Sequence, residues 1–270
     1  MNFEGVLGHE FVGRVVQADE KRWIDKRVVG EINIACGDCE YCRRGQTKHC
    51  LFRSVLGVQN KNGAFAEFLT LPVDNLHLLP RSVSDTEGVF VEPLAAALEI
   101  FDQIPIAKKD SVLVLGDGKL GLLVAQVMKL KAGEVHCRGK YEKKLELLRK
   151  KDIQTSLAGE RLEKRFDVVV EATGIERGLE ESLKWIKPRG KIVLKTTTRE
   201  KTRVAISRVV VDELQLIGSR CGPFLKAIDV LKRKRVRVEE MVDGDFPLEK
   251  AEQAFTMARE PGVMKVLITP

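Results

Sequence analysis

The chain has 270 residues, of which 44% are hydrophobic and 31% charged, and its formal net charge is +7. This length fits one large domain or two ordinary ones, with enough apolar residues for a sizeable core. No apolar run reaches the roughly 18–20 residues of a membrane span, and the first residues lack the basic-then-apolar pattern of a secretory signal. We therefore expect a cytoplasmic protein with no membrane partner.

The positive charge does not form a clear nucleic-acid patch, because Lys and Arg are scattered among 39 acidic residues. The densest run is Lys232-Arg233-Lys234-Arg235-Val236-Arg237. A nucleic-acid patch or a targeting signal is one interpretation of this run. We favour the solvated end of a helix, where cations also suit the helix dipole, and expect no nucleic-acid partner.

Residues 1–90 consist of short apolar stretches broken by Gly, Asp and Asn, which predicts an irregular β domain. The expected strands are Phe11–Val16, Arg27–Ile34, Ala64–Leu71 and Asn75–Leu79.

Near Ser84 the pattern changes to helical spacing over Asp85–Ile104, and strands then alternate with helices. The expected strands are Ser111–Leu115, Glu134–Cys137, Asp167–Glu171, Lys191–Lys195 and Leu214–Gly218, and the helices Lys119–Lys131, Glu142–Lys151 and Arg177–Trp185. Alternation with apolar strands predicts an α/β, doubly wound parallel sheet covered on both faces, over residues 91–222. Residues 223–270 add a helix at Leu248–Ala258 and a strand at Lys265–Ile268.

Four of the six cysteines crowd into fifteen residues, with the spacing C-x2-C-x2-C-x7-C: Cys36, Cys39, Cys42 and Cys50. In a cytosolic chain such a cluster favours a metal over disulfides. Four thiolates complete a tetrahedral zinc site and leave no position for substrate, so the predicted role is structural. An iron–sulfur cluster is the chemical alternative.

A glycine motif follows the first strand of the α/β region and opens a helix: Gly116-Asp117-Gly118-Lys119-Leu120-Gly121. In the strand–turn–helix context, G-x-G-x-x-G predicts a dinucleotide site. Gly116 makes the turn, Gly118 admits the pyrophosphate and Gly121 allows close packing, while the helix start at Lys119 and Leu120 offers free N–H groups to phosphate.

The end of the second expected strand, Glu134–Cys137, helps to distinguish an NAD site from an NADP site. NAD-preferring sites place Asp or Glu there. Aligning on the next helix puts Gly139 at that position, flanked by Arg138 and Lys140. Two cations could pair with a 2′-phosphate, so we favour NADP over NAD.

These motifs together resemble the medium-chain dehydrogenase/reductase superfamily, in its zinc-dependent alcohol, polyol and threonine dehydrogenase-like branch. The resemblance covers essentially the whole chain. It implies a GroES-like catalytic domain at 1–90 with the zinc lobe at 36–50, a Rossmann domain at 91–222, and a return to the catalytic domain at 223–270.

The resemblance also implies a catalytic zinc site. Gly8-His9-Glu10-Phe11-Val12-Gly13 matches the family motif G-H-E-x-x-G, which makes His9 a zinc ligand and Glu10 its neighbouring carboxylate. Glu92 matches the position where polyol and threonine dehydrogenases carry a Glu close to that zinc. By the same resemblance, Thr173 and Ser219 lie near the nicotinamide, and Arg220 could contact cofactor or substrate.

One family element is not in this sequence. Relatives carry a catalytic Cys upstream of G-H-E, whereas this chain begins only eight residues before His9. On that basis we expect dinucleotide binding with weak catalysis or none.

The implied activity is NAD(P)-linked oxidation of an alcohol or polyol, with zinc as Lewis acid, by a homodimer or homotetramer. Two alternatives remain open: a catalytically silent member that binds dinucleotide, and a zinc-independent quinone or enoyl reductase of the same superfamily.

Overall fold

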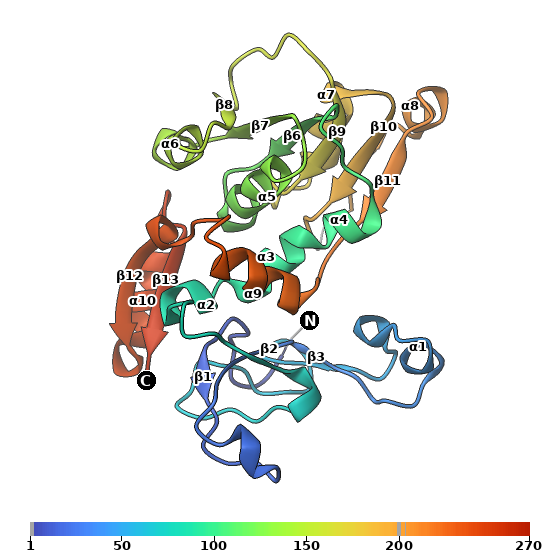
Figure 1. The fold of residues 1–270 in the computed structure, drawn as a ribbon. Helices are drawn as coiled ribbons and strands as arrows, with labels where there is room; N and C mark the ends of the chain where they lie inside the picture. The colour runs from blue at the N-terminus through green and yellow to red at the C-terminus, as the bar shows by residue number, and fades with distance from the viewer. Residues whose placement is uncertain (1–2, 199–200, 203) are drawn as a thin grey trace. The chain divides into compact units, whose positions relative to one another are not determined.

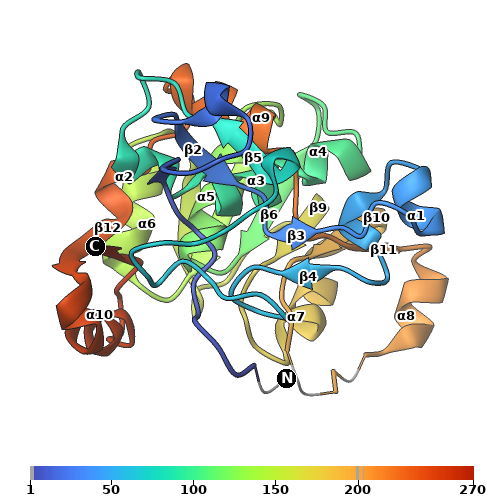
Figure 2. The same cartoon turned by 90° about the horizontal axis from the view of Figure 1, so that it is seen from below.

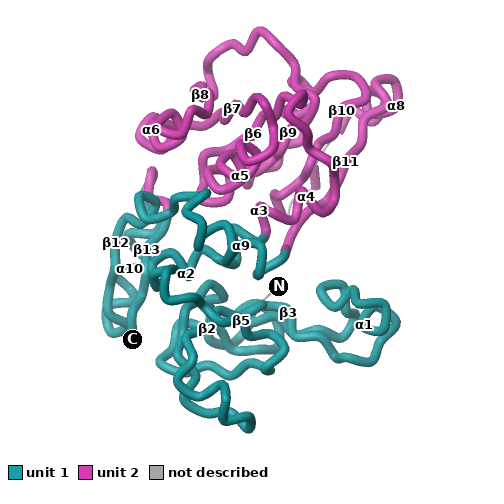
Figure 3. Tube along the Cα trace, viewed as in Figure 1, with its two compact units in different colours: residues 1–95, 223–260, 265–270 teal, residues 96–222, 261–264 magenta. Residues whose placement is uncertain are grey.

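The computed structural model describes residues 3–198, 201–202 and 204–270, and the chain divides into two units (Figure 3). Unit 1 comprises residues 1–95, 223–260 and 265–270, and unit 2 comprises residues 96–222 and 261–264. None of the helices in these described ranges is long and apolar enough to cross a membrane.

Unit 2 is built on a six-stranded parallel sheet (Figure 1). Its order is β11-β10-β9-β6-β7-β8, and every neighbouring pair is parallel. This order is the doubly wound arrangement of dinucleotide-binding folds, in which the strand order reverses between the first and fourth strands. The strands are β6 (Ser111–Leu115), β7 (Glu134–Gly139), β8 (Gln154–Leu157), β9 (Phe166–Glu171), β10 (Ile186–Leu194) and β11 (Gln215–Gly218).

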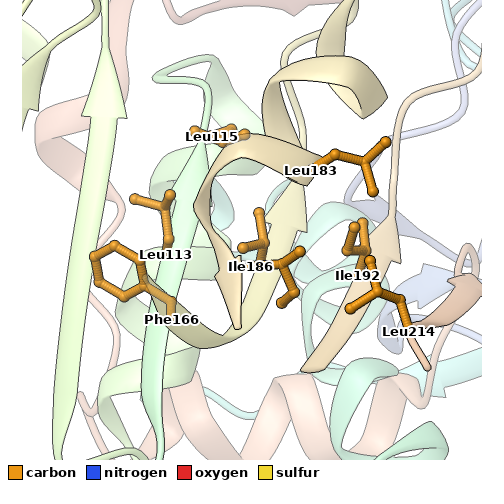
Figure 4. Packing of buried hydrophobic residues seen from close by; sticks show 8 residues of the cluster. Leu113, Leu115, Phe166, Leu183, Ile186, Ile192 and Leu214 are labelled. Atoms are coloured by element: carbon orange, nitrogen blue, oxygen red, sulfur yellow. The ribbon is translucent and has the colours of Figure 1, made fainter. Parts of the chain in front are cut away.

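In the described part of unit 2, one short helix precedes the first strand and the others connect consecutive strands of the sheet. They are α4 (Ile100–Gln103), α5 (Lys119–Lys129), α6 (Glu142–Arg149), α7 (Gly178–Trp185) and α8 (Ile206–Val211). Leu113 and Leu115 of β6 pack with Leu183 of α7 in one buried cluster (Figure 4). Because side chains alternate along a strand, the intervening Val112 and Val114, also buried, face the other side of the sheet.

Unit 1 contains three small sheets, shown from below in Figure 2. β1 (Gly13–Arg14), β2 (Arg27–Gly30) and β5 (Leu76–Leu78) form an antiparallel sheet, and β3 (Asn33–Ile34) pairs with β4 (Ser54–Val55). Late in the chain, β12 (Val242–Pro247) pairs in parallel with β13 (Lys265–Thr269).

The helices of unit 1 are short. They are α1 (Glu40–Arg43), α2 (Asp85–Gly88), α9 (Phe224–Lys232) and α10 (Ala251–Ala258), with α3 (Val91–Leu98) at its boundary. Single 3₁₀ turns lie at Lys21–Trp23, Thr47–His49, Val73–Asn75, Glu239–Met241 and Leu248–Lys250. Helix α9 ends at the basic run, as expected from the helix-end interpretation of that run.

Three predictions about elements are wrong. The single strand expected over Arg27–Ile34 is two strands, β2 and β3, which belong to different sheets. Residues 64–71, expected as a strand, pair with no strand of the described chain, because the main chain of Gly63–Phe65 bonds instead to the irregular segment Val6–Gly8. The single helix expected over Asp85–Ile104 is three separate helices, α2, α3 and α4. The first of them begins with a capping box, in which the Ser84 hydroxyl and the Glu87 carboxylate each accept a backbone N–H.

Candidate functional site

The four clustered cysteines bring their sulfurs together around one point. The Sγ–Sγ distances are 3.5 Å for Cys39–Cys42, 3.7 Å for Cys39–Cys50, 3.5 Å for Cys36–Cys50 and 3.9 Å for Cys36–Cys42. A tetrahedral zinc with Zn–S bonds of ~2.3 Å needs sulfurs about 3.8 Å apart. The lobe therefore has the size and donor set of a closed four-thiolate metal site.

Local hydrogen bonds prepare two of these sulfurs as thiolates. Backbone N–H groups of Cys42 and Leu51 donate to the Cys39 sulfur and lower its pKa to about 6, and the pKa of Cys36 is lowered in the same way by backbone N–H groups. Burial and the neighbouring sulfurs raise the pKa of Cys42 to about 12. Four thiolates so close together need a cation to offset their repulsion.

A second cluster in unit 1 joins His9, Glu10 and Glu92. One ligand atom from each lies within 4.8 Å of the others, and all three residues are partly buried. An imidazole nitrogen with two carboxylate oxygens is a donor set that zinc accepts while keeping an open position. The residues predicted to bind the catalytic zinc thus lie together, although Glu92 is 83 positions after His9 in the chain.

Close backbone packing holds the His9 segment. The Gly8 carbonyl accepts the N–H of Ala64, and a Cβ at Gly63 would stand 2.2 Å from that carbonyl oxygen. A side chain at this position would displace the segment that carries His9, so residue 63 must be glycine.

Lys265 contacts the cluster of His9, Glu10 and Glu92 through Glu10. Its ammonium is ion-paired with the Glu10 carboxylate, and the two side chains are 7% and 16% exposed. The same Nζ lies 3.4 Å from the carbonyl oxygen of Val89 and 4.7 Å from the centre of the Phe90 ring. Lys265 therefore fixes one rotamer of Glu10 beside His9.

The glycine motif lies between β6 and α5 in unit 2, as predicted. Gly118 caps α5, and a Cβ there would meet nothing within 4 Å, so the space above the turn is open to a phosphate. A Cβ at Gly121 would stand 2.0 Å from the Gly116 carbonyl oxygen, so the first turn of α5 can pack this closely only with glycine. Lys119 and Leu120 begin the helix, whose N-terminus attracts an anion through the helix dipole.

The turn after β7 is held by a side chain of the glycine motif. The Asp117 carboxylate accepts the backbone N–H groups of Lys140 (2.7 Å) and Tyr141 (2.6 Å). A Cβ at Gly139 would stand 2.4 Å from the Asp117 Cβ, so Asp117 fills the space that a side chain at the strand end would need. A carboxylate is thus present at this turn, from the loop rather than from the strand.

The two cations that flank Gly139 are placed differently. The buried Arg138 guanidinium donates to the Ala158 carbonyl and lies 5.4 Å from the centre of the Trp185 ring. Lys140 is exposed. Of this pair, Lys140 has the freedom to meet a ligand at the turn.

The remaining predicted residues lie at the carboxyl ends of β9 and β11. Thr173 donates from its backbone and its hydroxyl to the buried Glu171 carboxylate, at 2.8 and 2.5 Å. Ser219 and Arg220 follow β11, and both accept hydrogen bonds from the buried Lys195.

Sequence reasoning missed Asp117, Lys195 and Lys265. Asp117 occupies a variable position of the glycine motif, so the motif itself gives no signal for it. Lys195 and Lys265 each follow or begin a strand and carry no local pattern that separates them from surface lysines.

Two family models match the chain. The alcohol dehydrogenase GroES-like domain matches residues 1–81, and the glucose dehydrogenase C-terminus matches residues 86–269.

The relatives of this chain include polyol dehydrogenases. The chain is 27% identical to the sorbitol dehydrogenase of Halalkalibacterium halodurans, over 98% of this chain and 83% of that protein. It is 28% identical to the D-arabitol-phosphate dehydrogenase of Enterococcus avium, over 97% of this chain and 81% of that one.

Solved structures agree in fold. A protein of Sinorhizobium meliloti described as a zinc-binding dehydrogenase, solved with NADP, is 27% identical with a TM-score of 0.87, over 98% of this chain and 84% of that one. The alcohol dehydrogenase of Thermus sp. ATN1 is 27% identical with a TM-score of 0.86, over 98% and 86%.

Proposed function

Since the chain belongs to the zinc-dependent medium-chain dehydrogenases and is an NAD(P)-linked oxidoreductase of CH–OH groups, we propose that its substrate is a polyol or a phosphorylated sugar alcohol. The meeting of His9, Glu10 and Glu92 within 4.8 Å is the observation that carries this proposal. The sorbitol and arabitol-phosphate dehydrogenases among its relatives supply the substrate class.

We propose two zinc sites. The four cysteines, with sulfurs at tetrahedral spacing, hold a structural ion. His9 and Glu92 hold the second, and Glu10, oriented by Lys265, stands beside them. An ion bound there acts as a Lewis acid toward the substrate oxygen.

The dinucleotide binds at the glycine motif of unit 2. The open space over Gly118 and the N–H groups at the start of α5 receive the pyrophosphate. Thr173, Ser219 and Arg220, at the carboxyl ends of β9 and β11, then face the nicotinamide half.

For the choice of dinucleotide we propose NADP over NAD. Lys140 is an exposed cation at the turn that receives the adenosine ribose, and the strand end at Gly139 has no side chain to repel a 2′-phosphate. The NADP-bound Sinorhizobium structure is consistent with this preference. The Asp117 carboxylate would repel the same 2′-phosphate. The preference for NADP therefore depends on whether the attraction by Lys140 exceeds the repulsion by Asp117.

The assembly we propose is a homodimer or homotetramer paired through β11. This strand forms one edge of the six-stranded sheet, and an exposed edge is a natural pairing surface. In the same unit, Val210 and Val211 of α8 are 70% and 79% exposed. Light scattering at micromolar concentration tests the assembly, and a monomer mass would contradict it. The compartment we propose is the cytoplasm, where clustered thiols serve as metal ligands.

Steady-state turnover with a panel of polyols, polyol phosphates and simple alcohols, read from the absorbance of the reduced nicotinamide, tests the function. The sequence alone predicts weak catalysis or none, but His9, Glu10 and Glu92 together supply three possible zinc donors. We therefore expect activity with polyols, and its loss in His9→Ala and Glu92→Gln. The matched control Glu176→Gln changes an exposed carboxylate of unit 2 and should keep the wild-type rate.

Other outcomes separate the alternatives. Tight dinucleotide binding without turnover of any substrate would indicate a silent binding member. Reduction of quinones or enoyl compounds that is unaffected by His9→Ala would indicate the zinc-independent reductase chemistry of the superfamily.

A further inference from the structure

A buried lysine lies at the carboxyl end of β10, the middle strand of the half-sheet formed by β9, β10 and β11. Lys195 directly follows β10, between β9 and β11, and is 8% exposed. Burying an ammonium is costly unless its N–H groups are satisfied.

Three oxygens lie within hydrogen-bonding distance of its ammonium. The Lys195 Nζ lies 2.7 Å from the carbonyl oxygen of Ala96, 3.1 Å from the hydroxyl of Ser219 and 3.4 Å from the carbonyl oxygen of Arg220. An ammonium has three donors, so this geometry fits the charged form. Ala96 belongs to the last turn of α3, where the helix dipole also favours a cation.

The position of Lys195 in the sheet determines what it faces. In a doubly wound sheet the dinucleotide lies across the carboxyl ends of the strands, with one nucleotide on each half. The glycine motif after β6 and the turn after β7 take the adenosine half. The half formed by β9, β10 and β11 then takes the nicotinamide, at the strand ends where Lys195 lies.

Resting on the proposed function, we propose that Lys195 makes this site discriminate between the redox forms of the dinucleotide, favouring the reduced one. The oxidised nicotinamide ring is a cation, whereas the dihydronicotinamide ring is neutral. A fixed ammonium at the strand ends repels the first and not the second. In this role Lys195 is a specificity-determining residue that biases the enzyme toward reduction of the carbonyl substrate.

Equilibrium titration of the full-length chain with both redox forms of NADP and of NAD, without substrate, tests the inference. Three variants are compared with the wild type. Lys195→Gln removes the charge but keeps two N–H donors, and Lys195→Arg keeps the charge. Lys191→Gln, in the strand that Lys195 follows, is the matched control and lies roughly 13 Å away at ~3.3 Å per residue.

We expect Lys195→Gln to lower the ratio of reduced to oxidised affinity by about tenfold, mainly through tighter binding of the oxidised form. Lys195→Arg and Lys191→Gln should keep the wild-type ratio. Far-UV circular dichroism and the melting temperature verify that each variant is folded.

Equal weakening of both redox forms in Lys195→Gln would overturn the inference, because it is the result expected of a purely structural residue. So would a Lys195→Arg variant that behaves like Lys195→Gln. If the wild type binds neither redox form, the proposed function fails together with the inference. Binding with an unchanged ratio in Lys195→Gln overturns the inference alone.

Discussion

The cysteine lobe and the parallel sheet are stabilised in opposite ways. Of residues 36–50, all of them described, Cys50 is the single buried one, and the neighbouring Leu51 and Phe52 are 68% and 74% exposed. In β6 every residue is buried. The sheet is stabilised by the burial of apolar surface, whereas the lobe has almost none to bury and would be stabilised by ligand bonds to the proposed zinc.

Removing one sulfur of the lobe should give the largest effect. We expect Cys39→Ser to lower zinc affinity by at least about 100-fold and to unfold residues 36–50, because the lobe has no core to hold it without the ion. Elemental analysis measures the zinc content, and hydrogen exchange measures the unfolding of residues 36–50. Cys221→Ser, outside the lobe, is the matched control, and retention of tight zinc by Cys39→Ser would contradict the four-thiolate site.

Truncating a core side chain should affect the sheet instead. Phe166 is fully buried in the cluster with Leu113 and Ile186 (Figure 4). We expect Phe166→Ala to lower the free energy of unfolding of unit 2 by about 3–5 kcal/mol, with the zinc content unchanged. Urea denaturation measures it against Leu225→Ala, a residue 68% exposed, and a loss of zinc would show that lobe and sheet are not independent.

Removing the charge of Asp117, at the turn after β7, should leave the cysteine lobe and the parallel sheet folded. It should change the relative affinity for NADP and NAD. We expect Asp117→Asn to raise the affinity for NADP relative to NAD by about tenfold, because it removes a carboxylate near the ribose while the amide oxygen can still accept an N–H. Asp110→Asn is the control, since that carboxylate also accepts a backbone N–H, from Ala107 at 2.8 Å. An unchanged preference would remove Asp117 from the cofactor site.

The smallest effect concerns acid stability of the sheet. Burial alone would raise the pKa of Asp167, but hydrogen bonds from the Ser111 side chain and backbone, together with Lys187, outweigh it and lower the pKa to about 2. The unfolded value is about 3.9, so the ionised group contributes stability above pH ~4 that is lost as the pH falls from ~4 to ~2.

Asp167→Asn should therefore have a lower free energy of unfolding than the wild type at neutral pH. The difference between the two proteins should shrink as the pH falls from ~4 to ~2. Urea denaturation at a series of pH values measures this difference. A difference that stays constant down to pH ~2 would exclude the contribution of this carboxylate.

Some features of the candidate site could be predicted because they depend on residues close together in the chain. The three-residue steps between Cys36, Cys39 and Cys42 almost fix the geometry of the lobe, and the glycine motif makes its own turn. The expected strand at Ala64–Leu71 failed for the converse reason. A strand exists only when another segment pairs with it, and apolar composition says nothing of that partner.

The sequence by itself therefore determined the class of fold, the family, the cysteine lobe and the glycine turn proposed to receive the dinucleotide, since each depends on local spacing. Only the tertiary structure decided which distant residues complete the sites. It brings Lys265 to Glu10 across 255 positions, Lys195 to Ala96 across 99, and Asp117 to Lys140 across 23. Hydrogen bonds and ion pairs act over a few ångströms in space without regard to distance along the chain, so no pattern of neighbouring residues could reveal them.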